Sequence, residues 1–311
     1  MVMRKTRVLA GPLIHLLVVM LGTASLVFGA LRLTGDPAMM IAPPTATVDD
    51  LAAIRREYGL DRPVLVQYGD FLWKLAQGDL AESFRYRRPA LEVVLDRFGA
   101  TLQLALAAQA LAILVAIPLG VLSAVTRNTW INALCTAVAA AGQSIPHFWF
   151  GLMAIVLFGV HLGWLPTSGR GGLAHLVLPA VTLSAYSMAS LTRLVRSGVL
   201  EVLSADYIRT ARAKGLGTGA ILFKHTLKNA LIPIVTLIGV QFGALLTGAV
   251  IVETVFAWPG VGRLTIEAIH TRDYPLVQAG VLLMALVFVV LNQGVDLCYR
   301  WLDPRLGAEQ P

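Results

Sequence analysis

Histidine, cysteine and carboxylate side chains, which most often carry out catalysis or bind metals, are scattered along this chain. The six histidines occur singly. Neither H-E-x-x-H nor G-x-S-x-G is present, which removes the usual signatures of a zinc peptidase and a serine hydrolase. No lysine follows a glycine, so there is no phosphate-binding loop. We therefore expect no catalytic, cofactor-binding or metal-binding residue in this chain, and any energy for its work must come from another protein.

The remaining reactive groups in apolar segments are isolated. Glu253 and Asp296 are too far apart in the sequence to argue for a paired-carboxylate site. Cys135 and Cys298 lie in apolar runs and do not have the spacing of a disulfide framework or a metal site. We therefore interpret them as small buried hydrophobic residues. Asp296 precedes Arg300 by four residues, a favourable order for a local ion pair.

The segment 206–228 is unusually cationic. Its basic side chains are Arg209, Arg212, Lys214, Lys224 and Lys228. Anionic lipid attracts such segments by about 1 kcal/mol per residue, which accounts for the charge but not for the glycines that divide the segment. Nucleic acid normally requires a larger basic surface with aromatic side chains. An acidic groove on another protein, which would hold a short rigid helix, fits best as the partner.

Local signals predict that this basic segment begins with a short helix. Ser204 is a plausible N-cap, Asp206 lies in the first turn, where an acid favours the helix dipole, and Gly215 is placed to end the helix. Ile208 and Ala211 are three residues apart and would form an apolar stripe. The second half of the segment leads into an apolar stretch.

Composition and hydropathy predict an all-α polytopic membrane protein. The chain is 57% hydrophobic and 14% charged, whereas soluble domains contain about 25% charged residues. A bilayer core of about 30 Å requires roughly 20 apolar residues in a helix. The six predicted transmembrane helices cover residues 8–31, 99–125, 132–162, 175–198, 229–256 and 276–301.

Four polar residues within the predicted spans are candidates for a translocation path. Gln143 and Ser144 precede Pro146, which invites a kink in the third span, and Gln241 and Thr247 share much of one face of the fifth span. The alternative is that they form interhelical hydrogen bonds or allow close helix packing. Both interpretations remain open.

The distribution of Lys and Arg predicts the orientation. Segment 193–228 holds seven of them and the N-terminal tail three, whereas the short connections expected outside hold one and two. The long segment 34–98, with eight basic and ten acidic residues, can be translocated largely regardless of charge. We expect both termini and the basic segment in the cytoplasm.

The long segment 34–98 is expected to be ordered. Thr47 can cap a first short helix that ends at Gly59, and Pro63 opens a second helix that ends before Gly78. The simpler interpretation is that these helices pack flat on the outer rim of the protein; a docking surface for an external partner is a weaker possibility.

The predicted organisation has four segments. They are an N-terminal tail with the first span (1–33), an external loop with short helices (34–98), a five-helix core that includes the cytoplasmic loop 199–228 (99–301), and a cytoplasmic tail (302–311).

The basic segment resembles the characteristic cytoplasmic loop of ABC importer permeases, in which E-A-A, three residues, G and later I-x-L-P recur. Here R-T-A stands at 209–211, followed by Gly215, and H-T-L-K stands at 225–228. These departures are typical of the dipeptide/oligopeptide branch, which also includes nickel and glutathione importers. Arg209 thus stands where the motif has Glu, which reverses the charge at that position.

The resemblance extends along almost the whole chain. The matching motifs are LTGDPA (33–38), YGLDRPVLVQY (58–68), GDLAESF (78–84), QSIPHFWFGL (143–152), HLGWLPTSG (161–169), VETVFAWPGVGRL (252–264), RDYPLVQ (272–278) and LDPRL (302–306). Each is weak alone, but their shared order is a strong signal.

The resemblance implies a type I ABC importer permease fold in a bacterial inner membrane. It implies pairing with a second, homologous permease, two cytoplasmic ATPase subunits that bind ATP and Mg, and an extracytoplasmic substrate-binding protein, with no nucleic acid involved. The residues it implies for contact with the ATPase are Asp206, Arg209, Ala211, Arg212, Lys214 and Gly215. Dipeptides or oligopeptides are the implied cargo, with nickel, glutathione or an oligosaccharide as the alternative.

Two other classes of membrane protein compete with this interpretation. A stand-alone secondary transporter would have an inverted repeat and intramembrane ionisable residues, and the sequence offers no convincing repeat and few such residues. A channel or structural membrane protein would need no nucleotide at all. Uptake by this chain alone, without ATP, would favour either class.

Overall fold

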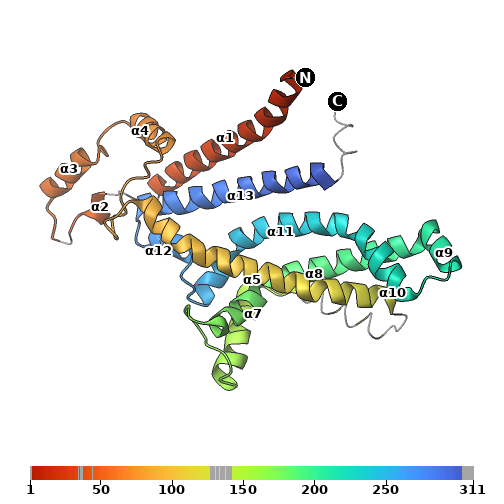
Figure 1. Ribbon diagram of the computed structural model, residues 1–311. Coiled ribbons are helices and arrows are strands. Elements are labelled where there is room, and N and C mark those ends of the chain that lie inside the picture. Colours follow the sequence, from red (N-terminus) through yellow and green to blue (C-terminus); the bar gives the residue numbers. More distant parts are fainter. Residues whose placement is uncertain are drawn as a thin grey trace. The chain divides into compact units, whose positions relative to one another are not determined.

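All the regular elements in the part of the chain that the computed structural model describes are helices, as the sequence predicts (Figure 1). That part is residues 2–302 without 34, 36–37, 44, 127–129, 131–132, 134–136 and 138–141. The helices are α1 (Val2–Leu33), α2 (Ala38–Ile41), α3 (Val48–Glu57), α4 (Val64–Ala76), α5 (Ala90–Val125), α7 (His147–Ala154), the π-helix η1 (Ile155–His161), α8 (Leu173–Ser204), α9 (Asp206–Ala213), α10 (Thr218–Ala220), the π-helix η2 (Ile221–Thr226), α11 (Leu227–Val255), α12 (Val261–His270) and α13 (Tyr274–Leu302).

Five helices in the described part are long and apolar enough to cross a membrane. They are Gly11–Leu33, Ala90–Val125, Leu173–Ser204, Pro233–Val255 and Tyr274–Val295, and they match five of the six predicted spans. The remaining predicted span, 132–162, falls partly outside the described residues; its described end is the shorter apolar helix His147–His161. The count of six therefore stays a prediction.

The chain folds into two compact units. The first unit comprises residues 1–101 and 259–290, and the second comprises 102–258 and 291–311. The predicted boundaries at 33, 98 and 301 follow the order of elements along the chain and stay a prediction. Each unit has its own apolar core.

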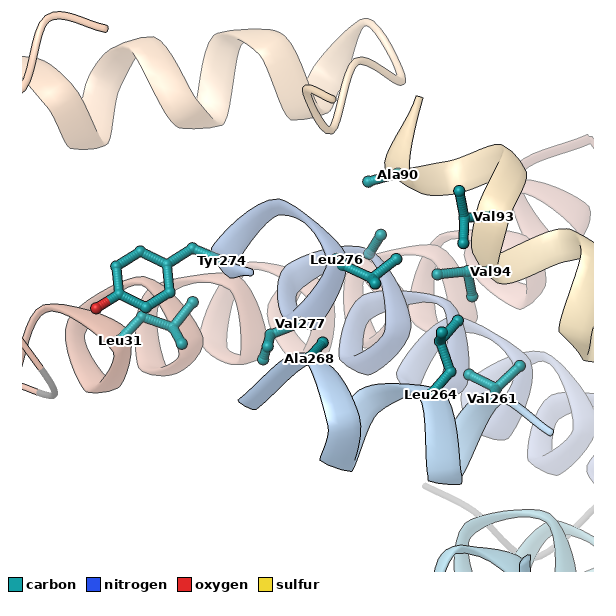
Figure 2. Close-up of a cluster of buried hydrophobic side chains, with 11 residues drawn as sticks. Leu31, Ala90, Val93, Val94, Val261, Leu264, Ala268, Tyr274, Leu276 and Val277 are labelled. Atoms are coloured by element: carbon teal, nitrogen blue, oxygen red, sulfur yellow. The ribbon is translucent and has the colours of Figure 1, made fainter. Parts of the chain in front are cut away.

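The core of the first unit is built where α12 and the start of α13 meet the ends of α1 and α5 (Figure 2). Val94 of α5, Leu264 of α12 and Leu276 of α13 are almost completely buried there, together with Leu31 of α1. Burying side chains of this size contributes about 1.5–3 kcal/mol each relative to exposure to water.

A buried carboxylate ties the predicted external loop to this core. Asp273 is 1% exposed and caps α13, because its Oδ1 accepts the backbone N–H of Leu276 at 3.3 Å. Its Oδ2 accepts the hydroxyl of Ser83 at 2.5 Å and the backbone N–H of Arg85 at 3.1 Å. Asp273 therefore both caps α13 and binds the loop at Ser83, which is 190 residues away in the sequence.

The corner between α12 and α13 is formed by the conformation of Arg272 and by a backbone hydrogen bond of Asp273. Arg272 adopts a left-handed conformation with φ of 50°, which costs a non-glycine residue about 1 kcal/mol. The following Asp273 donates its N–H to the carbonyl of Ala268, at 2.9 Å, and so closes α12. The hydroxyl of Tyr274 then donates to the carbonyl of Gly35 at 3.1 Å. Three motifs quoted from the sequence, 33–38, 78–84 and 272–278, therefore meet at this corner.

The core of the second unit joins α5, α8 and α11. Leu191 and Val195 of α8 and Ile234 of α11 are fully buried in it. The helices α5 and α8 approach closely because Gly120 of α5 has no side chain: a Cβ there would lie 2.6 Å from the Cβ of Val195. Such close contact is the usual basis of helix association inside a membrane.

The predicted helices of the external loop are confirmed. Thr47 caps α3 through a capping box, in which its Oγ1 accepts the N–H of Asp50 and its own N–H donates to the Asp50 carboxylate. The residue Gly59, with φ of 64°, follows α3, and α4 begins directly after Pro63. These local signals sufficed because each acts within a few residues.

We predict that Asp273→Ala lowers the stability of the first unit by about 3 kcal/mol, because it leaves the Ser83 hydroxyl and two backbone N–H groups buried without an acceptor. Asp273→Asn keeps an acceptor oxygen and should cost less. Thermal unfolding of the purified protein in a bilayer mimic measures both, with the exposed Asp61→Ala as the control. Equal melting temperatures for Asp273→Ala and Asp61→Ala would contradict the role given to this carboxylate.

Candidate functional site

The basic segment predicted to contact a partner begins with α9, Asp206–Ala213. One detail of the prediction is wrong. Ser204 does not cap the helix: its hydroxyl donates back to the carbonyl of Glu201 at 2.7 Å, and the N-cap position is taken by the extended Ala205. Serine often bonds backward along a helix in this way, and here it closes α8. The short helix itself is confirmed.

Gly215 ends α9 in the way that the sequence predicts. Its φ is 79°, a left-handed conformation that glycine adopts readily. Its N–H donates to the carbonyl of Arg212 at 2.9 Å, and the N–H of Leu216 donates to the carbonyl of Ala211 at 3.2 Å. This pair of bonds is a Schellman motif, which satisfies the last carbonyls of the helix and turns the chain sharply away.

One face of α9 is packed against neighbouring helices of the second unit. Ile208 is fully buried and Ala211 almost so, and both contact Ile221 of η2. On the adjoining face, the hydroxyl of Tyr207 accepts a hydrogen bond from the side-chain amide of Asn229, at 2.9 Å. Because Asn229 lies in α11, α9 is held to the start of a membrane-spanning helix as well as to the end of α8.

The predicted contact residues Asp206, Arg209 and Arg212 of α9, and Lys214 directly after it, are all exposed. Asp206 and Arg209 form an ion pair with 3.7 Å between Oδ1 and Nη1, whose side chains are 97% and 81% exposed. An exposed pair of this kind contributes little to stability. The cationic side chains are therefore accessible for contact with a partner.

The turn between α9 and α11 contains an element that sequence patterns did not indicate. Residues Ile221–Thr226 form the π-helix η2, and the Thr226 hydroxyl donates to the carbonyl of Ile221 at 3.1 Å. Both residues are buried. Wide turns of this type often occur at functional sites. The signal available in the sequence is the threonine five residues after Ile221, because its hydroxyl can donate to the Ile221 carbonyl.

The glutamines predicted for a translocation path both bond to serines of α8. The amide of Gln143 donates to the hydroxyl of Ser190 at 2.8 Å, and the hydroxyl of Ser187 donates to the Oε1 of Gln241. Ser187 and Ser190 are three residues apart and so share a helix face. For these two glutamines the structure shows interhelical hydrogen bonding, the alternative that the sequence left open.

The other two candidates lie differently. Thr247 is exposed, and its hydroxyl donates within α11 to the carbonyl of Ala244 at 3.1 Å. Six residues separate it from Gln241, so the two point from different faces of the helix. Ser144 is also exposed. The structure therefore does not gather the four predicted path residues around one point.

A polar residue that the sequence analysis did not single out lies in α5. Gln109 is 6% exposed, and neither atom of its side-chain amide has a hydrogen-bond partner in the described part of the chain. An unpaired buried amide costs about 1–3 kcal/mol. A glutamine in an otherwise apolar run was the available signal.

Two further features of the sequence concern metal ligands and an ion pair. No group of three or more His, Cys, Asp or Glu side chains gathers there. The side chains of Asp296 and Arg300 lie outside the described residues, as does the whole of Cys135. The predicted ion pair at the end of α13 stays a prediction.

Comparison with known proteins identifies what this arrangement is similar to. Residues 116–308 match the family described as binding-protein-dependent transport system inner membrane component, and residues 1–105 match the N-terminal region of such membrane components. The dipeptide transport system permease protein DppB of Alkalihalophilus pseudofirmus is 39% identical over 94% of this chain and 97% of its own length. The glutathione transport system permease protein GsiC of Salmonella typhimurium is 42% identical over 94% and 96%.

Solved structures share the fold. The inward-facing MetNI methionine ABC transporter superimposes with a TM-score of 0.55 at 21% identity, covering 68% of this chain and 96% of that chain. An amino acid ABC transporter with histidines gives a TM-score of 0.55 at 14% identity, covering 68% and 94%.

The end of α9 provides a test with a matched control. Gly215 and Gly217 both have open space where a Cβ would stand, but only Gly215 has a positive φ. We predict that Gly215→Ala destabilises the end of α9 by about 1 kcal/mol, which is roughly fivefold faster amide exchange, because only the backbone is strained. Gly217→Ala should leave exchange unchanged. Hydrogen exchange over residues 206–216 measures the difference, and equal rates in the two variants would show that the turn does not depend on the left-handed residue.

Proposed function

Because the chain belongs to the family of binding-protein-dependent transport system inner membrane components, we propose that its α9 couples the ATPase of an ABC importer to the membrane helices. Two family matches that together span residues 1–105 and 116–308 carry the assignment. The chain is a permease subunit of a binding-protein-dependent ABC importer and a multi-pass component of the bacterial inner membrane.

The coupling role of α9 is supported by the difference between its two faces. A helix that transmits force needs one face fixed to the elements that move and one face available to the motor. Ile208 and Ala211 fix the buried face, whereas the side chains of Arg209, Arg212 and Lys214 are exposed. Since acidic side chains complement such a face, the proposed ATPase groove is acidic.

The proposed movement follows from the two attachments of α9. Closure of the ATPase pair on ATP would push α9, and the chain connection at Ala205 would carry the push to α8. The bond from Asn229 to Tyr207 and the contact with Ile221 would carry it to α11. The helices α8 and α11 pack in one core, so they would rotate together as a rigid body and alternate the exposure of the path.

The proposed assembly has more members than this chain. We propose a second homologous permease subunit, two cytoplasmic ATPase subunits that hold ATP and Mg, and an extracytoplasmic substrate-binding protein. In the proposed orientation both termini and α9 face the cytoplasm, on the basis of the seven basic residues over 193–228. The six-span count is part of the same proposal.

Short peptides are the proposed cargo. One relative is a dipeptide permease and another is a glutathione permease, and both match 94% of this chain at similar identity. Glutathione is itself a tripeptide, so both cargoes are small peptides with charged ends. The choice between them depends on the binding protein and stays outside the proposal.

We predict that Arg209→Glu together with Arg212→Glu lowers substrate-stimulated ATPase activity of the reconstituted importer about tenfold, which corresponds to about 1.4 kcal/mol of lost contact energy. Both side chains are exposed, so folding should be unaffected. The control is Arg56→Glu on α3, an exposed cation that lies outside the basic segment. Wild-type stimulation in the double variant would show that α9 is not the coupling element.

The cargo class has its own test. In proteoliposomes that contain the whole importer and its binding protein, a dipeptide or glutathione is expected to raise ATPase activity severalfold, whereas nickel ions or an oligosaccharide should not. The measurement is phosphate release with each compound at equal concentration. Stimulation by nickel or the oligosaccharide alone would disprove the peptide assignment while leaving the importer assignment intact.

A further inference from the structure

The helix α4 has an apolar face that none of the described residues of its unit covers. Leu65 and Trp73 are 83% and 69% exposed, and Val66 is exposed beside them. At 100° per residue these side chains fall on one side of the helix, together with Gly69 and Ala76, which are exposed as well. A contiguous exposed apolar face of this kind marks a contact with a partner or a membrane.

The opposite side of α4 packs on the C-terminal end of α1, beside which it lies in Figure 1. The Tyr68 hydroxyl is 2.6 Å from the hydroxyl of Ser25, and the rings of Phe71 and Phe28 stack with centroids 5.5 Å apart. The guanidinium of Arg32 donates to Gln67. The helix α4 therefore contacts the last two turns of a candidate membrane-spanning helix.

These contacts fix the depth of α4. A charged side chain is costly inside the hydrocarbon, so Arg32 marks where α1 reaches the headgroup level. Ser25 precedes it by seven residues, which is about 10 Å along a helix. Contacts with Ser25 and Phe28 thus place α4 at most about 10 Å below the headgroups, the depth typical of helices that lie in the membrane interface.

The end of α1 that α4 contacts also exposes apolar side chains. Leu26 and Leu33 of α1 are exposed apolar residues at the same end of the span. On the other side, Asp70 pairs with Arg62 at 3.3 Å, and Lys74 borders a cavity of about 720 Å³ with a mixed lining that includes charged side chains such as Glu57 and Arg87. The helix therefore presents apolar residues where the first span meets acyl chains and polar residues away from them.

We propose that α4 is an interfacial helix whose apolar face, Leu65, Val66 and Trp73, is embedded in the lipid leaflet at the C-terminal end of α1. Tryptophan at its edge suits this level of a bilayer. The partner of the predicted external loop at this face is thus phospholipid, and the loop is anchored to the membrane between its two flanking spans. In the proposed orientation this is the outer leaflet.

The test compares the two faces of one helix. Single cysteines replace Leu65, Trp73 or Lys74 in a chain that carries Cys135→Ser and Cys298→Ser, and each is labelled with a small fluorophore in the assembled importer in proteoliposomes. Brominated phosphatidylcholine quenches from within the membrane, and iodide quenches from water. We expect brominated lipid to remove about half of the emission at 65 and 73 and almost none at 74, with iodide showing the reverse order.

Two results would overturn the proposal. Iodide quenching of equal strength at all three positions would place the apolar face in water. Protection of positions 65 and 73 that arises only when the substrate-binding protein is added would assign the face to that protein instead of lipid. Because Val66→Cys reports on the same face, a variant that fails to assemble does not leave the question open.

Discussion

Polar backbone groups at helix ends must find partners where water is scarce, and this constraint organises the first unit. Asp273 meets it for α13 by accepting the Leu276 N–H. The same carboxylate reaches Ser83 and the Arg85 backbone, so one cap also fixes the path of a long loop. The core around Leu276 forms beneath it. A helix start, a loop and a corner thereby depend on a single buried group.

Short-range signals in the sequence were sufficient for much of this architecture. The cap at Thr47, the stop at Gly215 and the apolar stripe of Ile208 and Ala211 all involve residues within a few positions of one another. Long apolar runs likewise predicted six membrane-spanning helices, and five of them match long apolar helices in the described part of the chain. Where two local options compete, the sequence does not decide: Ser204 could bond forward or backward, and in the structure it bonds backward.

Long-range pairings could not be predicted in this way. Nothing local links Ser83 to Asp273, although an acid two residues before a proline indicates a helix start. Nor does the sequence tell a path-lining glutamine from one that bonds to a neighbouring helix, which is why Gln143 and Gln241 needed the serines of α8 to be in place. The uncovered side of α4 became visible only once its packing on α1 was known.

The wide turn of η2 restricts the number of residues that can connect α9 and α11. Its hydrogen bonds span five residues instead of four, so everything after Thr226 is offset by about one position, or about 100° around the axis, from a continuous α-helix. The side of α11 that carries Ile234 into the core is set by that offset. Loss of one residue here would point a different row of side chains at α8. Spacing in this connector is therefore as restricted as the identity of the residues it aligns.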